Sequence, residues 1–169
     1  MSFALPRRRL LAATFGVSLL AASAQLRFGG YVAGEGPLAD WERTVCMALL
    51  ARICARDTAD APSPESVGAP AFVVEYVAQL PAPMRQELRA FLLLIEHAAP
   101  VLAGVSRHRW TLLDADAQDR VLLWLDASAP DRLASAFAAT KSLFFMAYYR
   151  APATWAQLGY DGPKVVGQQ

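Results

Sequence analysis

Few side chains in this sequence are placed to do chemistry. The two histidines, His97 and His108, each lack a second ligand at the i+4 spacing or in the short clusters that metal sites usually show. Glu96 adjoins His97, but adjacent residues on a helix point to diverging faces. We therefore expect both histidines to be structural.

Three carboxylates, Asp114, Asp116 and Asp119, cluster where a helix is expected to begin. Negative charge at that end complements the helix macrodipole, which is a sufficient structural reason for them. Acid–base catalysis would need a second element pointing at them, and the sequence offers none. The glycine-rich, P-loop and nucleophile-elbow motifs are also missing from the sequence. We predict no catalytic residue, no cofactor site and no metal site in this chain.

The two cysteines, Cys46 and Cys54, lie in a segment that reads as one helix. Eight residues at 1.5 Å per residue would separate their Cα atoms by roughly 12 Å. A disulfide needs less than about 7 Å. Both are therefore expected to be buried thiols, and the missing Cys-x-x-Cys-His motif excludes covalently attached haem.

The segment 137–163 is unusually aromatic. On an expected helix over 130–150, one face carries Leu133, Phe137, Thr140, Phe144 and Tyr148, yet bulky side chains also lie off that face. Such a helix is either central in its own bundle or covered by a partner, and both alternatives stay open. Tyrosine and tryptophan favour an interface. The candidate interface residues are Lys141, Phe144, Phe145, Tyr148, Tyr149, Trp155 and Tyr160.

These residues must be positioned by helices, because no stretch alternates as a strand does. We predict an all-α fold, a small bundle of about five helices preceded by an export leader. The expected elements are helices at 41–56, 71–80, 83–99, 115–127 and 130–150, a loop at 57–70 and a short terminal helix at 152–158. The expected organisation is an export signal over 1–24, an extended lead-in over 25–39, the helical domain over 40–163 and a tail over 164–169.

Several residues mark the ends of these helices. Asp40 and Asp114 are suited to cap the N-termini of the first and fourth helices. Pro100 is expected to end the third helix, and Pro130 to occupy the first turn of the fifth. The stripe that we expect this third helix to bury comprises Met84, Leu88, Phe91, Leu92, Ile95 and Ala99.

The first 24 residues resemble an export signal. Three arginines, at 7–9, precede an apolar run. This run leads into Ala22-Ser23-Ala24, which fits an A-x-A cleavage site. The run is shorter than the roughly 20 residues of a membrane-spanning helix. The arginines also resemble a twin-arginine signal, from which Pro6 and Ala12 depart. We expect a periplasmic or exported protein. An ordinary secretory leader and an uncleaved membrane anchor are the alternatives to a twin-arginine signal.

The net charge excludes one class of partner. The formal net charge is +1, and the three leader arginines supply +3, which leaves −2 for the remaining residues. A nucleic-acid-binding protein would carry a basic field instead. We therefore expect no nucleic-acid partner.

Short motifs near the C-terminus are shared with a known family: Phe137-x-x-x-Lys141-x-Leu143, Tyr148-Tyr149, Trp155 and Leu158-Gly159-Tyr160-x-Gly162-Pro163. They resemble the gluconate 2-dehydrogenase subunit 3 family and, more closely, the N-terminal segment of long-chain fatty alcohol oxidases. The segment from Phe72 to Pro81, followed by Glu87-Leu88-Arg89, is similar to that segment too.

This resemblance implies an accessory role. In that family a small subunit accompanies a large flavoprotein of the glucose-methanol-choline type, often with a cytochrome c, and the complex can associate with the membrane. FAD and the catalytic histidine belong to the large subunit. The chain is thus expected to be a non-catalytic subunit that stabilises and escorts an alcohol or sugar dehydrogenase for export. The alternative is a stand-alone exported helical protein that binds a small apolar ligand or the membrane surface.

Overall fold

The computed structural model describes residues 36–54, 61–127 and 129–161. They belong to one compact unit, residues 35–169. The expected export signal, most of the lead-in, residues 55–60 and the tail lie outside the described residues. No helix in the described part of the chain is both long enough and apolar enough to span a membrane.

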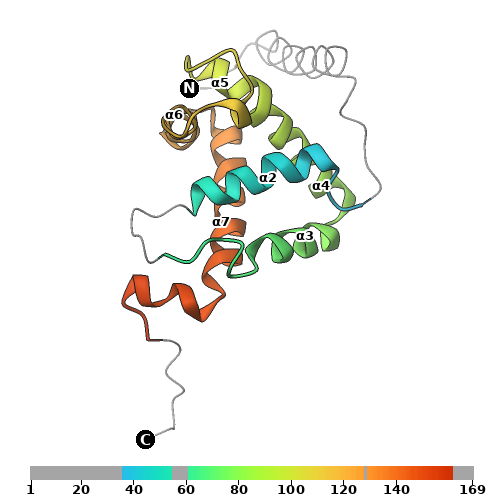
Figure 1. Cartoon of the computed structure of the whole chain (residues 1–169). Coiled ribbons are helices and arrows are strands. Elements are labelled where there is room, and N and C mark those ends of the chain that lie inside the picture. Colours follow the sequence, from blue (N-terminus) through green and yellow to red (C-terminus); the bar gives the residue numbers. More distant parts are fainter. Residues whose placement is uncertain (1–35, 55–60, 128, 162–169) are drawn as a thin grey trace, which may run out of the picture. The chain divides into compact units, whose positions relative to one another are not determined.

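Within these ranges the structure is all-α, as predicted (Figure 1). The five main helical segments correspond to the five expected helices, with the third broken by a π-helical turn. Short 3₁₀ turns complete the fold. In chain order the elements are α2 (Asp40–Ile53), α3 (Ala69–Gln79), α4 (Ala82–Leu93), the π-helical turn η1 (Leu94–Ala98), α5 (Ala99–Leu102), η2 (Trp110–Leu112), α6 (Ala115–Ala127), α7 (Asp131–Tyr149), η3 (Pro152–Thr154) and η4 (Ala156–Leu158).

Helix α7 is the central element, packing against α2, α3, α4 and α6. Figure 1 shows it in orange, running behind α2. Its buried face repeats at helical spacing and meets the buried apolar side chains of the neighbouring helices, and this burial stabilises the fold. The Tyr148 hydroxyl donates to the Pro62 carbonyl oxygen at 2.7 Å and ties the segment before α3 to this helix. The buried residues of α7 are Phe137, Thr140, Phe144, Ala147 and Tyr148.

The start of α2 differs from the expectation that Asp40 caps it. The N-cap residue is Ala39, and the helix already includes Asp40. Glu42, three residues beyond the cap, reaches back so that its Oε2 accepts the Ala39 N–H at 2.6 Å. This is one half of a capping box, and it satisfies a backbone donor that an alanine side chain cannot. Asp40 remains exposed in the first turn, where its charge suits the helix dipole.

The expectation that Pro100 ends the third helix is wrong. A proline inside an α-helix lacks an N–H, and its ring clashes with the carbonyl four residues earlier. Here the π-helical turn η1 widens the helix just before Pro100, so the chain continues through α5. The helix ends at Leu102, and Gly104, just beyond the C-cap residue Ala103, has a φ of +67°. The Val105 N–H donates to Pro100 O at 2.9 Å and the Gly104 N–H to Val101 O at 3.0 Å, which is a Schellman motif.

Other boundaries agree more closely with the sequence. Helix α6 has the predicted bounds, and the prediction that Asp114 caps it is confirmed, because its Oδ1 accepts the Ala117 N–H at 2.8 Å. Pro130 is the N-cap of α7 rather than part of its first turn. Helix α3 starts at Ala69, inside the expected loop, and the expected terminal helix is two 3₁₀ turns instead.

Candidate partner interface

Two buried carboxylates are fully committed to holding the fold. Glu42 accepts the Ala39 N–H through one oxygen and a hydrogen bond from Arg89 through the other, which raises the pKa of Arg89. Glu96 accepts the Thr111 N–H at 3.1 Å and the Thr111 hydroxyl at 2.6 Å. Each carboxylate joins segments far apart in the sequence, and we call these two arrangements the acid clasps. Their oxygens are already occupied by structural partners.

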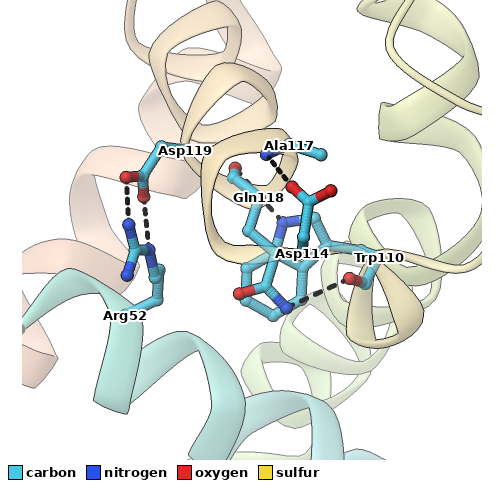
Figure 2. Close-up of polar contacts among 6 residues, drawn as sticks. All are labelled: Arg52, Trp110, Asp114, Ala117, Gln118 and Asp119. Carbon is cyan, nitrogen blue, oxygen red and sulfur yellow. Dashed lines mark hydrogen bonds and ion pairs between the residues drawn. The ribbon is translucent and has the colours of Figure 1, made fainter.

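The carboxylates at the start of α6 are also used structurally (Figure 2). Asp114 caps the helix, and Asp119 makes a two-pronged ion pair with Arg52 of α2. Beside them the Gln118 side-chain amide donates to the Trp110 carbonyl oxygen at 3.2 Å, and the Trp110 indole N–H points at the Gln118 carbonyl oxygen at 3.5 Å. Figure 2 shows these contacts locking α6 onto α2 and η2.

The histidines do not converge on a common site. His97 lies half-buried in η1, where burial and, secondarily, the charge of Arg109 lower its pKa. His108 is exposed in the loop before η2. Over residues 36–54, 61–127 and 129–161, no group of three or more His, Cys, Asp or Glu side chains is placed to share a metal ion.

The cysteines are both buried and free, so the prediction that they form no disulfide is confirmed. Burial raises the pKa of the Cys46 thiol to about 12, and the charge of Glu42 adds to this shift. The Cys54 thiol points at the Phe144 carbonyl oxygen at 3.8 Å. Both thiols are enclosed, and they behave as small apolar groups of the core.

The structure corrects the predicted interface at two positions. Phe144 and Tyr148 have no exposed surface, so they are core residues and present nothing to a partner. Both repeat on the inward face of α7, and the sequence alone left both burial in the bundle and burial under a partner open. Phe145, next along the helix, is 37% exposed.

The other predicted interface residues lie at or near the surface. Lys141 pairs with Asp126 of α6, and its Nζ sits 4.9 Å from the centroid of the Phe137 ring. The Trp155 indole N–H donates to Tyr149 O at 2.7 Å, and the Trp155 and Tyr160 rings are 5.4 Å apart. The first of these contacts holds Trp155 against the end of α7, and the Tyr160 ring remains about half exposed.

A groove that the sequence analysis missed lies between α3, α4 and α7 and has a volume of about 440 Å³. We call it the apolar groove. Its walls include Tyr76 of α3 and Met84 of α4, and its α7 side is built from Ala139, Ser142 and Met146. The feature of the sequence that could have indicated the groove is the uncharged outer face of α7, where small residues precede Met146. It was overlooked because the neighbouring aromatic residues dominate that segment.

A second, smaller hollow lies on the other side of α7, towards α6, with a volume of about 280 Å³. Leu123 and Phe145 line it, together with Lys141 and Asp126. Its charged residues are already paired, Lys141 with Asp126 and Asp119 with Arg52. The outer face of α7 therefore separates two hollows of different electrostatic character.

The helical unit matches a family model described as gluconate 2-dehydrogenase subunit 3 over residues 40–162. That range runs from the first residue of α2 to just beyond η4. The chain belongs to the gluconate 2-dehydrogenase subunit 3 family. It is thus an accessory subunit of a dehydrogenase complex, while the likeness to long-chain fatty alcohol oxidases stays a prediction. Neither the curated proteins nor the solved structures contain a match to this chain.

Proposed function

We propose that this gluconate 2-dehydrogenase subunit 3 protein is the non-catalytic small subunit of a flavin-dependent dehydrogenase of the glucose-methanol-choline type. In this proposal FAD and the catalytic groups belong to the large subunit, which oxidises an alcohol or a sugar and passes electrons on, in some complexes to a cytochrome c. The small subunit stabilises that flavoprotein and accompanies it across the membrane. Family membership supports the subunit role.

The outer face of α7 is the observation that carries this proposal. From Ser135 to Met146 its exposed positions hold no charged side chain, and Phe145 and Met146 are 37% and 45% exposed. A helix on the surface of a free-standing domain normally places charges there. An uncharged surface that exposes large apolar side chains is typical of a site that another protein covers. The exposed residues in question are Ser135, Ala138, Ala139, Ser142, Phe145 and Met146.

The fate of the polar groups supports a structural role for this chain. Glu42, Glu96 and Asp119 are each held by hydrogen bonds or ion pairs that connect helices. A general acid or base must instead be free to reach a substrate proton. These three carboxylates thus serve the fold.

The first test is purification of the C-terminally tagged chain from its native host under mild conditions. Mass spectrometry of the co-purifying chains and the flavin absorbance are then recorded. A stoichiometric large chain with bound flavin is the expected result. A lone, colourless monomer would overturn the proposal.

The export route has a separate test. Replacing the three leader arginines, Arg7, Arg8 and Arg9, with lysine should retain both the small subunit and its flavoprotein inside the cell, because the twin-arginine route requires the arginine pair. The matched control is Arg27→Lys, outside the expected signal. Cell fractionation with a flavin assay gives the readout, and unchanged export of the triple variant would argue against this route.

The apolar groove also favours one alternative function. Its volume of about 440 Å³ falls in the range of small-molecule sites, and its lining is mostly apolar. A stand-alone exported protein could bind a small apolar ligand there or lie on a membrane surface. Such a protein would purify as a soluble monomer with lipid or another apolar molecule bound, so the same purification separates the two functions.

A further inference from the structure

We infer, resting on the proposed function, that the apolar groove is the docking site for the large subunit. Its occupant is an apolar, convex helical segment of that subunit with an arginine or lysine at its edge, opposite Glu87. The inference goes beyond the family assignment because it names a surface, a binding mode and the charge of the partner.

The shape of the groove suits a helix. Tyr76 and Leu80 contribute from α3, and Met84 and Leu88 from α4. On the α7 side, Ala136, Ala139 and Ser142 recur at three-residue spacing, so small side chains leave room for the backbone of an incoming helix. Helix-in-groove recognition uses such an apolar trough. Met84 and Met146, 53% and 45% exposed, are flexible side chains that adapt to an inserted surface.

The charge at the groove indicates which partner fits. Among the described residues that line it, Glu87 alone carries a charge. Among the described residues, none makes an ion pair with Glu87, whereas Glu42 and Glu96 inside the fold are both occupied. A basic residue on the partner would supply the missing countercharge and fix the register of docking.

The same charge argues against two other occupants. A second copy of this chain would bring an identical concave surface and the same negative charge to the groove, and an isologous contact must be complementary to itself. A membrane surface is nearly flat on the scale of the groove, and its anionic headgroups would repel Glu87. A narrow apolar segment with a basic edge satisfies both the shape and the charge.

The smaller hollow beside α6 is the less suitable docking site. Its charged residues already neutralise one another through the Arg52–Asp119 and Lys141–Asp126 pairs. Docking there would have to break or desolvate existing pairs, which costs free energy. Docking in the apolar groove would break no ion pair.

Substitutions in the full-length chain, co-expressed with the flavoprotein identified by purification, test the inference. Met84→Glu combined with Met146→Glu should lower recovery of the flavoprotein by at least about tenfold, because buried contacts at the centre of an interface dominate binding. Leu123→Glu makes the same kind of change beside the smaller hollow, and Leu112→Glu makes it on η2, where the side chain is 72% exposed. Both controls should retain normal recovery, and circular dichroism should show all variants equally helical.

Glu87→Gln tests the charge. Recovery by the wild-type chain should fall as salt rises, and the variant should bind severalfold more weakly at low salt with a flatter salt response. A photo-crosslinking residue at position 84 should then join the large subunit at a peptide containing arginine or lysine, and one at position 112 should not.

The outcomes separate the inference from the proposed function. If the wild-type chain retrieves no flavoprotein, the proposed function fails. If it retrieves the flavoprotein but the double glutamate variant does so equally well, the function stands and the groove is not the docking site. Loss with Leu123→Glu alone would move the interface to the smaller hollow. If lipid or a second copy of this chain were found bound in the groove, the proposal that a segment of the large subunit occupies it would be wrong.

Discussion

The acid clasps and the apolar groove use opposite chemistry. In the clasps, charged Glu42 and Glu96 lie inside the fold, and each is satisfied by partners from a different segment. In the groove, apolar Met84 and Met146 lie at the surface with no covering element among the described residues. The contrast shows that the buried charged side chains maintain the fold, whereas the exposed apolar side chains are available to bind a partner.

Glu42→Ala should produce the largest change in stability. It leaves the Ala39 N–H and the Arg89 guanidinium without their acceptor and opens space beneath α2. We expect the free energy of unfolding to fall by about 3 kcal/mol, chiefly because the buried Ala39 N–H loses its acceptor, whereas the Arg89 side chain, 39% exposed, regains water. Urea unfolding gives the measurement. The neighbouring Asp40→Ala, at an exposed position, is the control and should change stability by less than about 0.5 kcal/mol.

Glu96→Ala and Glu87→Ala form a matched pair on the same helical stretch. Glu96→Ala removes two hydrogen bonds from Thr111 and should lower the free energy of unfolding by about 2 kcal/mol. Glu87→Ala, at an exposed groove position, should leave stability within about 0.5 kcal/mol and instead reduce flavoprotein recovery. Unfolding curves and recovery assays on both variants give the comparison. If Glu87→Ala lowered stability and Glu96→Ala lowered only flavoprotein recovery, the distinction between the two regions would be wrong.

Much of the fold could be predicted from local signals. The helical periodicity identified all five helices, and the Asp114 cap fixed the start of α6 because capping acts within three residues. The errors at Asp40 and Pro100 have a common cause. Glu42 replaces Asp40 as the capping group, and the π-helical turn accommodates Pro100. Tertiary packing determines both arrangements, and local sequence patterns carry no signal of that packing.

The candidate interface was predictable only in part. The sequence indicated that α7 was apolar nearly all round, which correctly drew attention to that helix. It could not separate Phe144 and Tyr148, which are buried by α7's neighbours, from Phe145, which remains exposed. The apolar groove needs α3, α4 and α7 together, and residues such as Met84 and Ala139 approach one another only through the fold.

Asp114→Ala should have a smaller effect, because it removes a single cap at the start of α6. The Ala117 N–H would lose its acceptor, and we expect about 1 kcal/mol of destabilisation by urea unfolding. Asp116→Ala is the control, since Asp116 is exposed and makes no capping bond in the structure described. Flavoprotein recovery should be unchanged in both, because this network lies apart from the residues that line the groove.

The smallest expected effect concerns pH and His97. Burial, aided by the charge of Arg109, lowers the pKa of His97 below 6.5, so the folded state favours the neutral ring. The stability that this preference contributes is present above pH 6.5 and is lost as the pH falls through the folded-state pKa, because the unfolded chain then binds the proton first. His97→Gln should therefore flatten the decline in unfolding free energy just below pH 6.5, with His108→Gln, on the surface, as the matched control. Because no histidine lines the apolar groove, flavoprotein recovery should keep its pH response in His97→Gln, and a changed response would couple the polar interior to the docking face.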